Sequence, residues 1–336
     1  MSEPTIEDVA LAAGVSIRTV SRVLNKSPKV NAQTREKIEA AIAALHFRPS
    51  PRARALAMRR SLLIGLIHND RNALVLDSIQ RGIISVTAER GYELIVHSTP
   101  LGGEAAIADV IAFAGRSRVD GLIVLPPIAG VEGLAPALDA AAVPAVALSA
   151  VPLEGFAGVI HSDERAAGAH VAEHLLTLGH RRLGLINGPA DTASARERRA
   201  GFVARVEAEP DATLAEASGD YGFASGMEAA QTLLALPQPP TAIFAANDIM
   251  AAGVLKIAAR KGLSVPAQLS VVGFDGSMLA QMVSPALTSI TRPFDTIAAA
   301  ATRHLLARIE GTPPPEPYHP VLTLTPAEST APPGQR

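Results

Sequence analysis

Short apolar runs that alternate with helix-length segments constrain the fold of this chain more than any other feature. Near-continuous apolar strands separated by helices are typical of parallel sheets that are covered on both faces. The series occurs twice, around residues 62–160 and 162–290, and so predicts two similar α/β lobes. The strand candidates lie at 62–68, 92–98, 119–126, 143–149, 157–163, 181–188, 213–220, 241–248, 269–276, 287–293 and 319–326.

Length and composition limit the class of protein. The 336 residues suffice for two or three folding units. Hydrophobic residues make up 48% of the chain, but no run approaches the roughly 20 apolar residues of a membrane span. The first residues, MSEPTIEDVA, carry acids where a secretory signal would be basic and then apolar, so we expect a cytoplasmic protein. The absence of cysteine excludes disulfides, thiolate metal sites and a cysteine nucleophile.

The net charge of −2 hides a strong asymmetry along the chain. Residues 1–60 hold eleven Lys and Arg against five Asp and Glu, whereas the rest of the chain has an acidic excess. A small basic head on a larger acidic body indicates a module that binds a polyanion.

Three short helices are predicted in the head. Thr5 and Asp8 form a near capping box for the first helix, which Gly14 ends. Ser16 caps a second helix at once, and Asn31 caps a third. A helix, a tight glycine-containing turn and another helix are the signature of a helix-turn-helix unit.

The second helix of such a unit meets DNA base edges with its N-terminal residues. Ile17, Arg18 and Arg22 lie outside the apolar stripe of this helix; arginine can contact guanine and isoleucine a thymine methyl. A solvated helical face is the better explanation for Arg18 taken alone, but it does not explain the whole basic and hydroxyl-rich cluster. The predicted DNA contacts in the head are Thr5, Ser16, Ile17, Arg18, Thr19, Ser21, Arg22, Asn25, Asn31 and Thr34.

These segments, TIEDVALAAGVSIRTVSRVLN, VNAQTREKIEAAIAAL and FRPSPRARAL, resemble the head of the LacI/GalR family of bacterial transcription regulators, and the resemblance continues to about residue 325. It implies a periplasmic-binding-protein-like body of two Rossmann-like lobes with parallel sheets. It also implies that residues 49–60 form a hinge helix, although composition alone fits a basic linker equally. In that hinge the predicted DNA contacts are Arg52, Ala53 and Leu56, the leucine wedging a base step of the minor groove.

Polar residues follow the predicted strands of the body, where ligands of open α/β sheets bind. Carboxylate, amide and guanidinium groups beside an aromatic ring suit a polyhydroxylated ligand. The resemblance assigns effector binding to Arg198, Tyr221, Asn247 and Asp275, but Gly276 stands where the family often has a second acid. The complete set of predicted effector contacts is Asn72, Ser149, Asp163, Arg196, Arg198, Tyr221, Asn247 and Asp275.

Enzymatic interpretations find little support. The chain has no Walker A loop, and no Gly-x-Gly-x-x-Gly follows a strand. His170 and His174 share a helix face, but the glutamate of an HExxH zinc motif is absent. We therefore expect no catalytic residues, no cofactor and no metal.

The predicted organisation is a helix-turn-helix domain at 1–48, a hinge at 49–60, an effector-binding and dimerisation domain at 61–325 and a disordered tail at 326–336. Lobe 1 would span about 61–161 and 292–318, and lobe 2 about 162–291 and 319–325. We predict a homodimeric repressor of carbohydrate utilisation genes that binds a pseudo-palindromic operator on double-stranded DNA and is released by a sugar. The alternatives are a regulator that needs a purine or protein corepressor, and a cytoplasmic sugar-binding protein without a DNA role.

Overall fold

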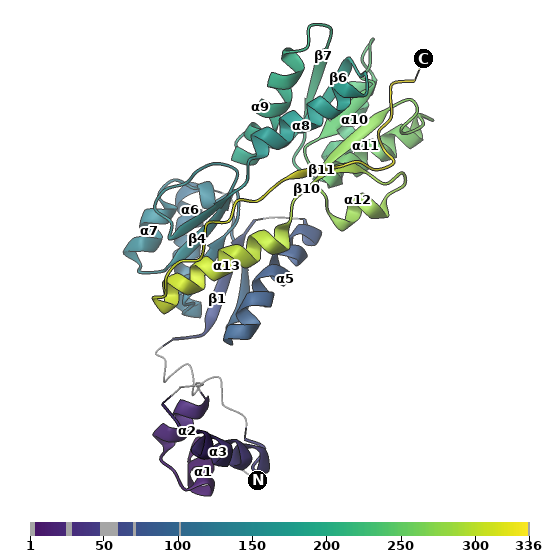
Figure 1. The fold of residues 1–336 in the computed structure, drawn as a ribbon. Coiled ribbons are helices and arrows are strands. Elements are labelled where there is room, and N and C mark those ends of the chain that lie inside the picture. Colours follow the sequence, from purple (N-terminus) through teal and green to yellow (C-terminus); the bar gives the residue numbers. More distant parts are fainter. Residues whose placement is uncertain (1–3, 25–28, 48–59, 70–71, 101, 335–336) are drawn as a thin grey trace. The chain divides into compact units, whose positions relative to one another are not determined.

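A computed structural model of the 336-residue chain describes residues 4–24, 29–47, 60–69, 72–100 and 102–334. The chain divides into two compact units, Met1–Leu62 and Leu63–Arg336. Among the described residues, no helix is long and apolar enough to cross a membrane. Figure 1 shows the order of the elements, which are considered unit by unit below.

The first unit contains α1 (Ile6–Ala13), α2 (Ile17–Leu24) and α3 (Ala32–Ala44), as the sequence predicts. Thr5 and Asp8 form the predicted capping box, Gly14 ends α1 in the left-handed conformation, and Asn31 caps α3 through the Thr34 amide. The core of the unit is small and apolar, and consists of Val9, Ala10, Val20, Val23, Ile38, Ala41 and Phe47.

In the second unit, lobe 1 is a parallel sheet with strand order β2-β1-β3-β4-β5. Helices α6 and α7 contribute to the core on one face, and α5 packs with α13 on the other. Its elements are β1 (Leu63–His68), α5 (Ala73–Arg90), β2 (Glu93–Ser98), α6 (Gly103–Ser117), β3 (Gly121–Val124), the 3₁₀ turn η1 (Ile128–Gly130), α7 (Leu134–Ala140), β4 (Ala145–Ser149), β5 (Gly158–His161) and, much later in the chain, α13 (Phe294–Glu310).

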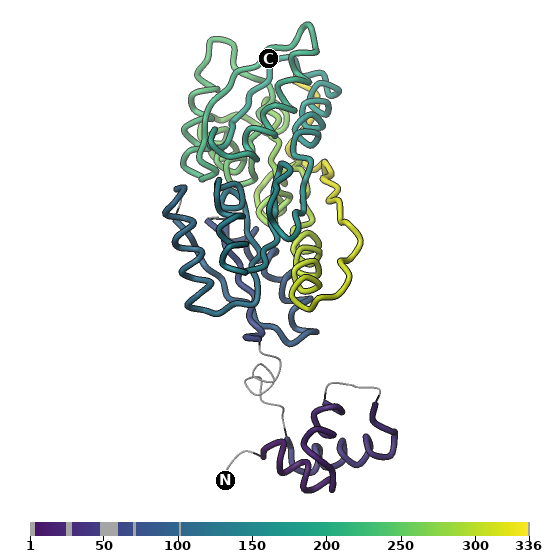
Figure 2. The backbone as a smooth tube through the Cα atoms, turned by 90° about the vertical axis from the view of Figure 1, so that its left-hand side faces the viewer, coloured from purple at the N-terminus to yellow at the C-terminus, as the bar shows by residue number. Residues whose placement is uncertain are grey.

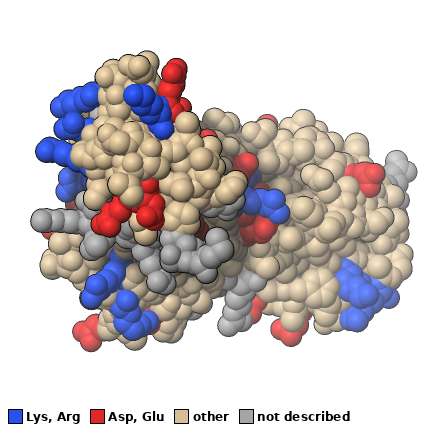
Figure 3. Space-filling view, turned by 90° about the horizontal axis from the view of Figure 1, so that it is seen from below, with Lys and Arg blue, Asp and Glu red and all other residues tan. Residues whose placement is uncertain are grey.

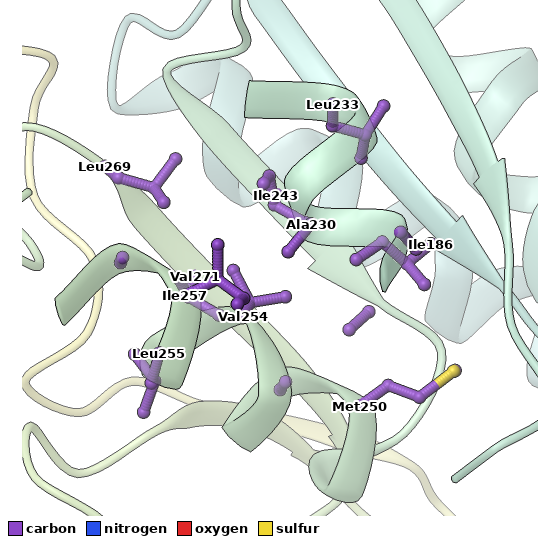
Figure 4. Packing of buried hydrophobic residues seen from close by; sticks show 14 of the residues in the cluster. Ile186, Ala230, Leu233, Ile243, Met250, Val254, Leu255, Ile257, Leu269 and Val271 are labelled. Atoms are coloured by element: carbon purple, nitrogen blue, oxygen red, sulfur yellow. The ribbon is translucent and has the colours of Figure 1, made fainter. Parts of the chain in front are cut away.

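Lobe 2 has strand order β11-β10-β9-β8-β6-β7. Helices α10 and α11 pack against one face of the sheet, and α8 and α9 cover the other (Figure 4 shows the core under α11). Its elements are α8 (Glu164–Thr177), β6 (Arg182–Asn187), α9 (Ala193–Glu207), β7 (Thr213–Ser218), α10 (Phe223–Leu234), β8 (Ala242–Ala245), α11 (Asp248–Arg260), β9 (Ser270–Asp275), α12 (Met278–Met282), β10 (Thr288–Thr291) and β11 (Thr323–Thr325).

The predicted two-lobed α/β architecture is confirmed, with one difference in strand direction. Strand β11 runs antiparallel to β10, pairing Leu324 with Ile290, whereas the other pairings of both sheets are parallel. The chain has by then returned from lobe 1 to lobe 2, as the yellow segment of Figure 2 shows. It reaches the sheet from the opposite end and closes its edge.

The predicted disordered tail is wrong for residues 326–334. Ser329 is fully buried, its backbone oxygen accepts from the Val271 amide, and its hydroxyl donates to the Val271 carbonyl oxygen at 2.6 Å. The Ala331 amide donates to the hydroxyl of Ser270 at 3.1 Å. The tail therefore adds backbone hydrogen bonds at the start of β9, a role that its polar, proline-rich composition conceals.

A buried histidine holds this tail. The imidazole of His180 lies 2.9 Å from both Thr241 Oγ1 and the Ala331 carbonyl oxygen, and 3.1 Å from Ser270 Oγ. Burial lowers the pKa of His180 below its ordinary value of 6.5, although the hydrogen bond to Ala331 opposes that shift. The unfolded chain thus binds the proton more tightly than the native protein does.

This difference predicts that the body loses stability in mild acid. The contribution of His180 is fully present above the unfolded pKa near 6.5, and is lost as the pH falls below it. In melting curves between pH 7.5 and 5, His180→Gln should flatten the decline of Tm with acid. His170→Gln, which changes an exposed histidine of α8, is the control and should leave the decline as in the wild type. Equal slopes for wild type and His180→Gln would contradict this assignment.

Candidate functional site

The first candidate surface is the exposed side of α2 in the head. Ile17 is 45% exposed, and Arg18 beside it is also exposed. Figure 3 shows Lys and Arg side chains on the surface of the head, at the upper left of the view. An apolar side chain and a guanidinium at the start of one helix suit the edges of base pairs in a major groove.

Several hydroxyl and amide groups predicted as DNA contacts also stabilise helix ends. Thr5 accepts from the Asp8 amide, Ser16 accepts from the Thr19 amide and contacts the Thr19 hydroxyl at 2.9 Å, and Asn31 accepts from the Thr34 amide. Ser21 and Arg22 are half-buried. Four further predicted contacts, Asn25, Arg52, Ala53 and Leu56, lie outside the described residues, as does the rest of the predicted hinge up to residue 59.

The second candidate site lies in lobe 2, where four of the eight predicted effector residues come together. Arg198 of α9 is 4% exposed and Asp275, at the end of β9, is 6% exposed. The Arg198 guanidinium lies 5.8 Å from the Tyr221 ring centroid and 3.8 Å from that of Phe274. The side-chain amide of Asn247 donates to the Tyr221 carbonyl oxygen at 2.9 Å.

A carboxylate that sequence reasoning missed holds Arg198 in place. Glu164, the first residue of α8, has no exposed surface, and its Oε2 accepts from Arg198 Nε at 2.7 Å. Helices α8 and α9 approach closely because Gly168 and Gly201 lie at their contact, where a Cβ would overlap the Arg198 and Arg165 carbonyl oxygens. Arg198 Nη1 also donates to the carbonyl oxygen of Ala246.

A second arginine, also missed, completes the cluster. Arg292 follows β10 and is 13% exposed; its Nη2 lies 3.1 Å from Glu164 Oε1 and its Nη1 3.6 Å from Asp275 Oδ1. Arg198 Nη2 lies 4.0 Å from the same Asp275 oxygen. Two cations and two anions alternate in sign, so the cluster carries no formal net charge.

The charges hold one another ionised. Burial alone would raise the pKa of Glu164, but Arg198 and Arg292 outweigh it and leave the pKa below its usual range. Burial likewise opposes the charge on Arg198, yet Glu164 and its other neighbours raise the pKa of the guanidinium. Removing one partner of such a pair typically costs roughly 3–5 kcal/mol, because the other charge is left buried and uncompensated.

The backbone at this cluster is strained. Tyr221 has φ = 68° and Asp275 has φ = 108°, backbone angles that residues other than glycine rarely adopt. Each such residue costs on the order of 1–3 kcal/mol and persists only where its surroundings enforce it. Burial raises the pKa of the Tyr221 hydroxyl, which remains a neutral hydrogen-bonding group beside Arg198.

The other four predicted effector residues take different roles within the described structure. Asp163 is exposed and caps α8 by accepting from the Ala166 amide, so its neighbour Glu164 is the residue that reaches the cluster. Arg196 is exposed and donates to the Ala190 and Asp191 carbonyl oxygens. In lobe 1, Asn72 caps α5, and the buried Ser149 hydroxyl accepts from the Val151 amide.

Two buried polar atoms at equivalent strand ends have no hydrogen-bond partner among the described residues. They are Nδ1 of His68, which ends β1, and Oδ1 of Asn187, which ends β6. Strands β1 and β6 hold equivalent places in the two sheets. Both atoms therefore lie at the carboxyl edges of the strands, where a polar ligand of an open sheet would meet them.

One cavity lies away from the Arg198 cluster. Its volume is about 790 Å³, and it lies between α7 and the C-terminal half of α13, lined in part by Leu138, Phe156, His304 and Arg308. None of the predicted effector residues lines it. No group of three or more His, Cys, Asp or Glu side chains within the described ranges could hold a metal ion.

Comparison with known proteins places this arrangement in a family. The model of the bacterial regulatory proteins of the lacI family matches residues 5–50, and that of the periplasmic binding protein-like domain matches residues 172–330. The ribose operon repressor of Escherichia coli (strain K12) is 33% identical over 309 residues, which are 91% of this chain and 93% of that protein. The chain belongs to the LacI family.

Further members of the LacI family match over similar lengths. The lactose operon repressor of the same strain is 34% identical over 93% of this chain and 86% of its own length. The HTH-type transcriptional repressor PurR of Pectobacterium carotovorum is 34% identical over 91% and 90%. A lac repressor dimer bound to operator and the anti-inducer ONPF superposes with TM-score 0.79 and 32% identity, covering 98% of this chain and 100% of that one.

Gly276, which departs from the common family pattern, is explained by its surroundings. It has φ = 61°, and a Cβ there would lie 2.6 Å from Thr291 Cα on the neighbouring strand. A side chain at this position would therefore collide with β10, in addition to the strain of the left-handed backbone. A second acid at this position would not fit the observed packing between the ends of β9 and β10.

Gly276→Ala should accordingly destabilise the body by roughly 1–3 kcal/mol, because overpacking adds to backbone strain. The matched control is Gly262→Ala, at φ = 69° with no atom within 4 Å of its Cβ, where strain alone acts. We expect a loss of about 1 kcal/mol for the control. Denaturant melts measure both variants, and equal losses would show that the collision with Thr291 is relieved without cost.

Proposed function

We propose that this chain is a DNA-binding transcriptional repressor whose operator affinity is changed by a small polyhydroxylated effector bound at the Arg198 cluster. The observation that carries the proposal is the exposed Ile17–Arg18 pair at the start of α2, in a helix-turn-helix unit of the LacI family. Protein two-fold symmetry is mirrored in paired half-sites, so a homodimer on a pseudo-palindromic operator is expected. In keeping with action on operator DNA, the proposal includes a cytoplasmic location and no enzymatic role.

The chemistry of the cluster favours an uncharged effector. Arg198 and Arg292 are already balanced by Glu164 and Asp275, so a phosphate or carboxylate would add charge that nothing offsets. Hydroxyl groups instead can donate to Asp275 and accept from a guanidinium, and the Tyr221 ring offers a flat surface. A solved relative of 29% identity and TM-score 0.71, which covers 97% of this chain and 99% of that one, is a transcriptional regulator CelR–cellobiose complex. We therefore propose a sugar.

The direct test is operator binding with and without sugars. An operator is selected from random DNA with the wild-type protein, and release is then measured in gel shifts against a panel of sugars and purines. Release by a sugar supports induction. Tighter binding with a purine would instead establish the corepressor alternative, and failure to select any sequence would overturn the DNA-binding role.

The base-reading role of α2 is tested with Arg18→Ala. If Arg18 contacts a base edge, its loss should weaken operator binding by roughly 1–3 kcal/mol and random DNA binding much less. Lys37→Ala, which removes an exposed charge of α3, is the control and should affect both DNAs alike. A uniform loss for Arg18→Ala in fluorescence anisotropy would assign this residue to phosphate instead.

The effector role of Asp275 is tested with Asp275→Asn, because asparagine tolerates a positive φ better than most residues. Loss of a charged acceptor should weaken effector binding by roughly 1.5–3 kcal/mol. The variant should remain on its operator at sugar concentrations that release the wild type. Asp211→Asn, in the exposed turn before β7, should respond as the wild type does. Loss of operator binding with normal sugar affinity would show that Asp275 is structural.

A further inference from the structure

Two residues of the charged cluster lie where the chain passes between the lobes. Glu164 begins α8, three residues after β5 of lobe 1 ends at His161. Arg292 lies between β10 of lobe 2 and α13, which packs on lobe 1. The ion pair from Arg292 Nη2 to Glu164 Oε1, at 3.1 Å, therefore joins two of the three connections between the lobes.

Each member of this crossover pair also contacts one candidate ligand group. Glu164 Oε2 accepts a hydrogen bond from Arg198 Nε at 2.7 Å. Arg292 Nη1 lies 3.6 Å from Asp275 Oδ1. Arg292 is further fixed by the Phe294 ring, whose centroid lies 4.6 Å from its guanidinium carbon. The crossover pair thus contacts Arg198 on one side and Asp275 on the other.

These contacts determine which part of Arg198 remains for a ligand. Its Nε donates to Glu164 and its Nη1 to the Ala246 carbonyl oxygen. Its Nη2 lies at the Asp275 end, 4.0 Å from that carboxylate, a separation too long for a direct hydrogen bond. Phe274 covers one face of the guanidinium at 3.8 Å, so the group cannot turn without losing several contacts at once.

We infer that Glu164 and Arg292 are positioning residues of the effector site, and that their ion pair holds Arg198 Nη2 and the Asp275 carboxylate in the arrangement that a ligand hydroxyl meets. This inference rests on the proposed effector function of Arg198 and Asp275. It assigns the two residues no contact with the ligand. It predicts that the orientation of Arg198 depends on Glu164 even when no ligand is present.

The test reads Arg198 directly. In protein labelled with ¹⁵N-arginine, the Nε–Hε signal of Arg198 is assigned by its disappearance in Arg198→Lys. Glu164→Gln removes the negative charge of the carboxylate that accepts from Arg198 Nε, so the signal should move, and should broaden because its proton exchanges faster with water. The matched control is Glu197→Gln, the same substitution one residue before Arg198, where the carboxylate pairs at 2.7 Å with Arg165. That control should leave the Arg198 signal in place.

Arg292 supplies the second set of variants. Arg292→Gln should also move the Arg198 signal, because Glu164 loses its other partner, whereas Arg292→Lys keeps the charge and should restore the wild-type position. Circular dichroism establishes which variants fold, and Arg292→Gln replaces Glu164→Gln if the latter does not. A folded Glu164→Gln or Arg292→Gln protein with an unchanged Arg198 signal would overturn the inference.

Ligand binding gives an independent readout. With D-ribose and cellobiose as probes in calorimetry, Glu164→Gln should bind whichever sugar the wild type binds about tenfold more weakly or worse, and Glu197→Gln should match the wild type. Unaltered sugar affinity in Glu164→Gln would overturn the positioning role. Failure of the wild type to bind any operator would overturn the proposed function but not the signal of Arg198, so the two failures are distinguishable.

Discussion

Burial of the Arg198 guanidinium is the physical constraint on which the rest of the body depends. A cation that is 4% exposed is stable only when anions and hydrogen-bond acceptors surround it. Glu164 provides the anion, the Ala246 carbonyl oxygen provides an acceptor, and Phe274 provides a flat ring below the guanidinium. These three partners come from α8, from the end of β8 and from β9. The demands of one side chain therefore align three elements at one edge of the sheet.

The same partners explain why strained backbone persists there. The positive φ of Tyr221 is maintained because its carbonyl oxygen accepts from Asn247, whose own side-chain oxygen caps α11 at the Met250 amide. Asp275 keeps its positive φ between two arginines, and Gly276 after it packs directly against Thr291. The loops that would contact a ligand are thus fixed by bonds to one another. The conformational entropy of these loops is lost when the protein folds, so less conformational entropy is lost when a ligand binds.

The sequence predicts the fold well because local signals agree with the final structure. All eleven strand candidates become strands, although the edge strands β2, β7 and β11 contain no buried residue, and the predicted caps Thr5 and Asn31 cap their helices. The site is predicted less well. Asp163 is the N-cap of α8, and its neighbour Glu164, at the first helical position, points inward. The burial of Glu164 depends on Arg198, which lies 34 residues later in the chain. No local pattern signals such a pairing.

The prediction of a disordered tail fails for a related reason. Its polar, proline-rich composition is typical of disorder, but Ser329 and Ala331 satisfy backbone and hydroxyl groups at the start of β9. Composition indicates how little apolar surface a segment can bury. It does not indicate which backbone and hydroxyl groups of an existing sheet need hydrogen-bond partners that the segment could provide. Arg292 illustrates the same limit, since its partners Glu164 and Asp275 come from two separate parts of the chain.

The position of the cluster bears on how a ligand could change the shape of the body. A ligand shifts a conformational equilibrium only by the difference in its interaction free energy with the two states. Groups at the crossovers are the ones whose surroundings must change when the lobes move, because those segments absorb the rotation. Glu164 and Arg292 occupy two crossovers and contact Arg198 and Asp275. A ligand that binds those two side chains would therefore act on groups that already contact the crossover segments, and no separate relay between the site and the crossovers is needed.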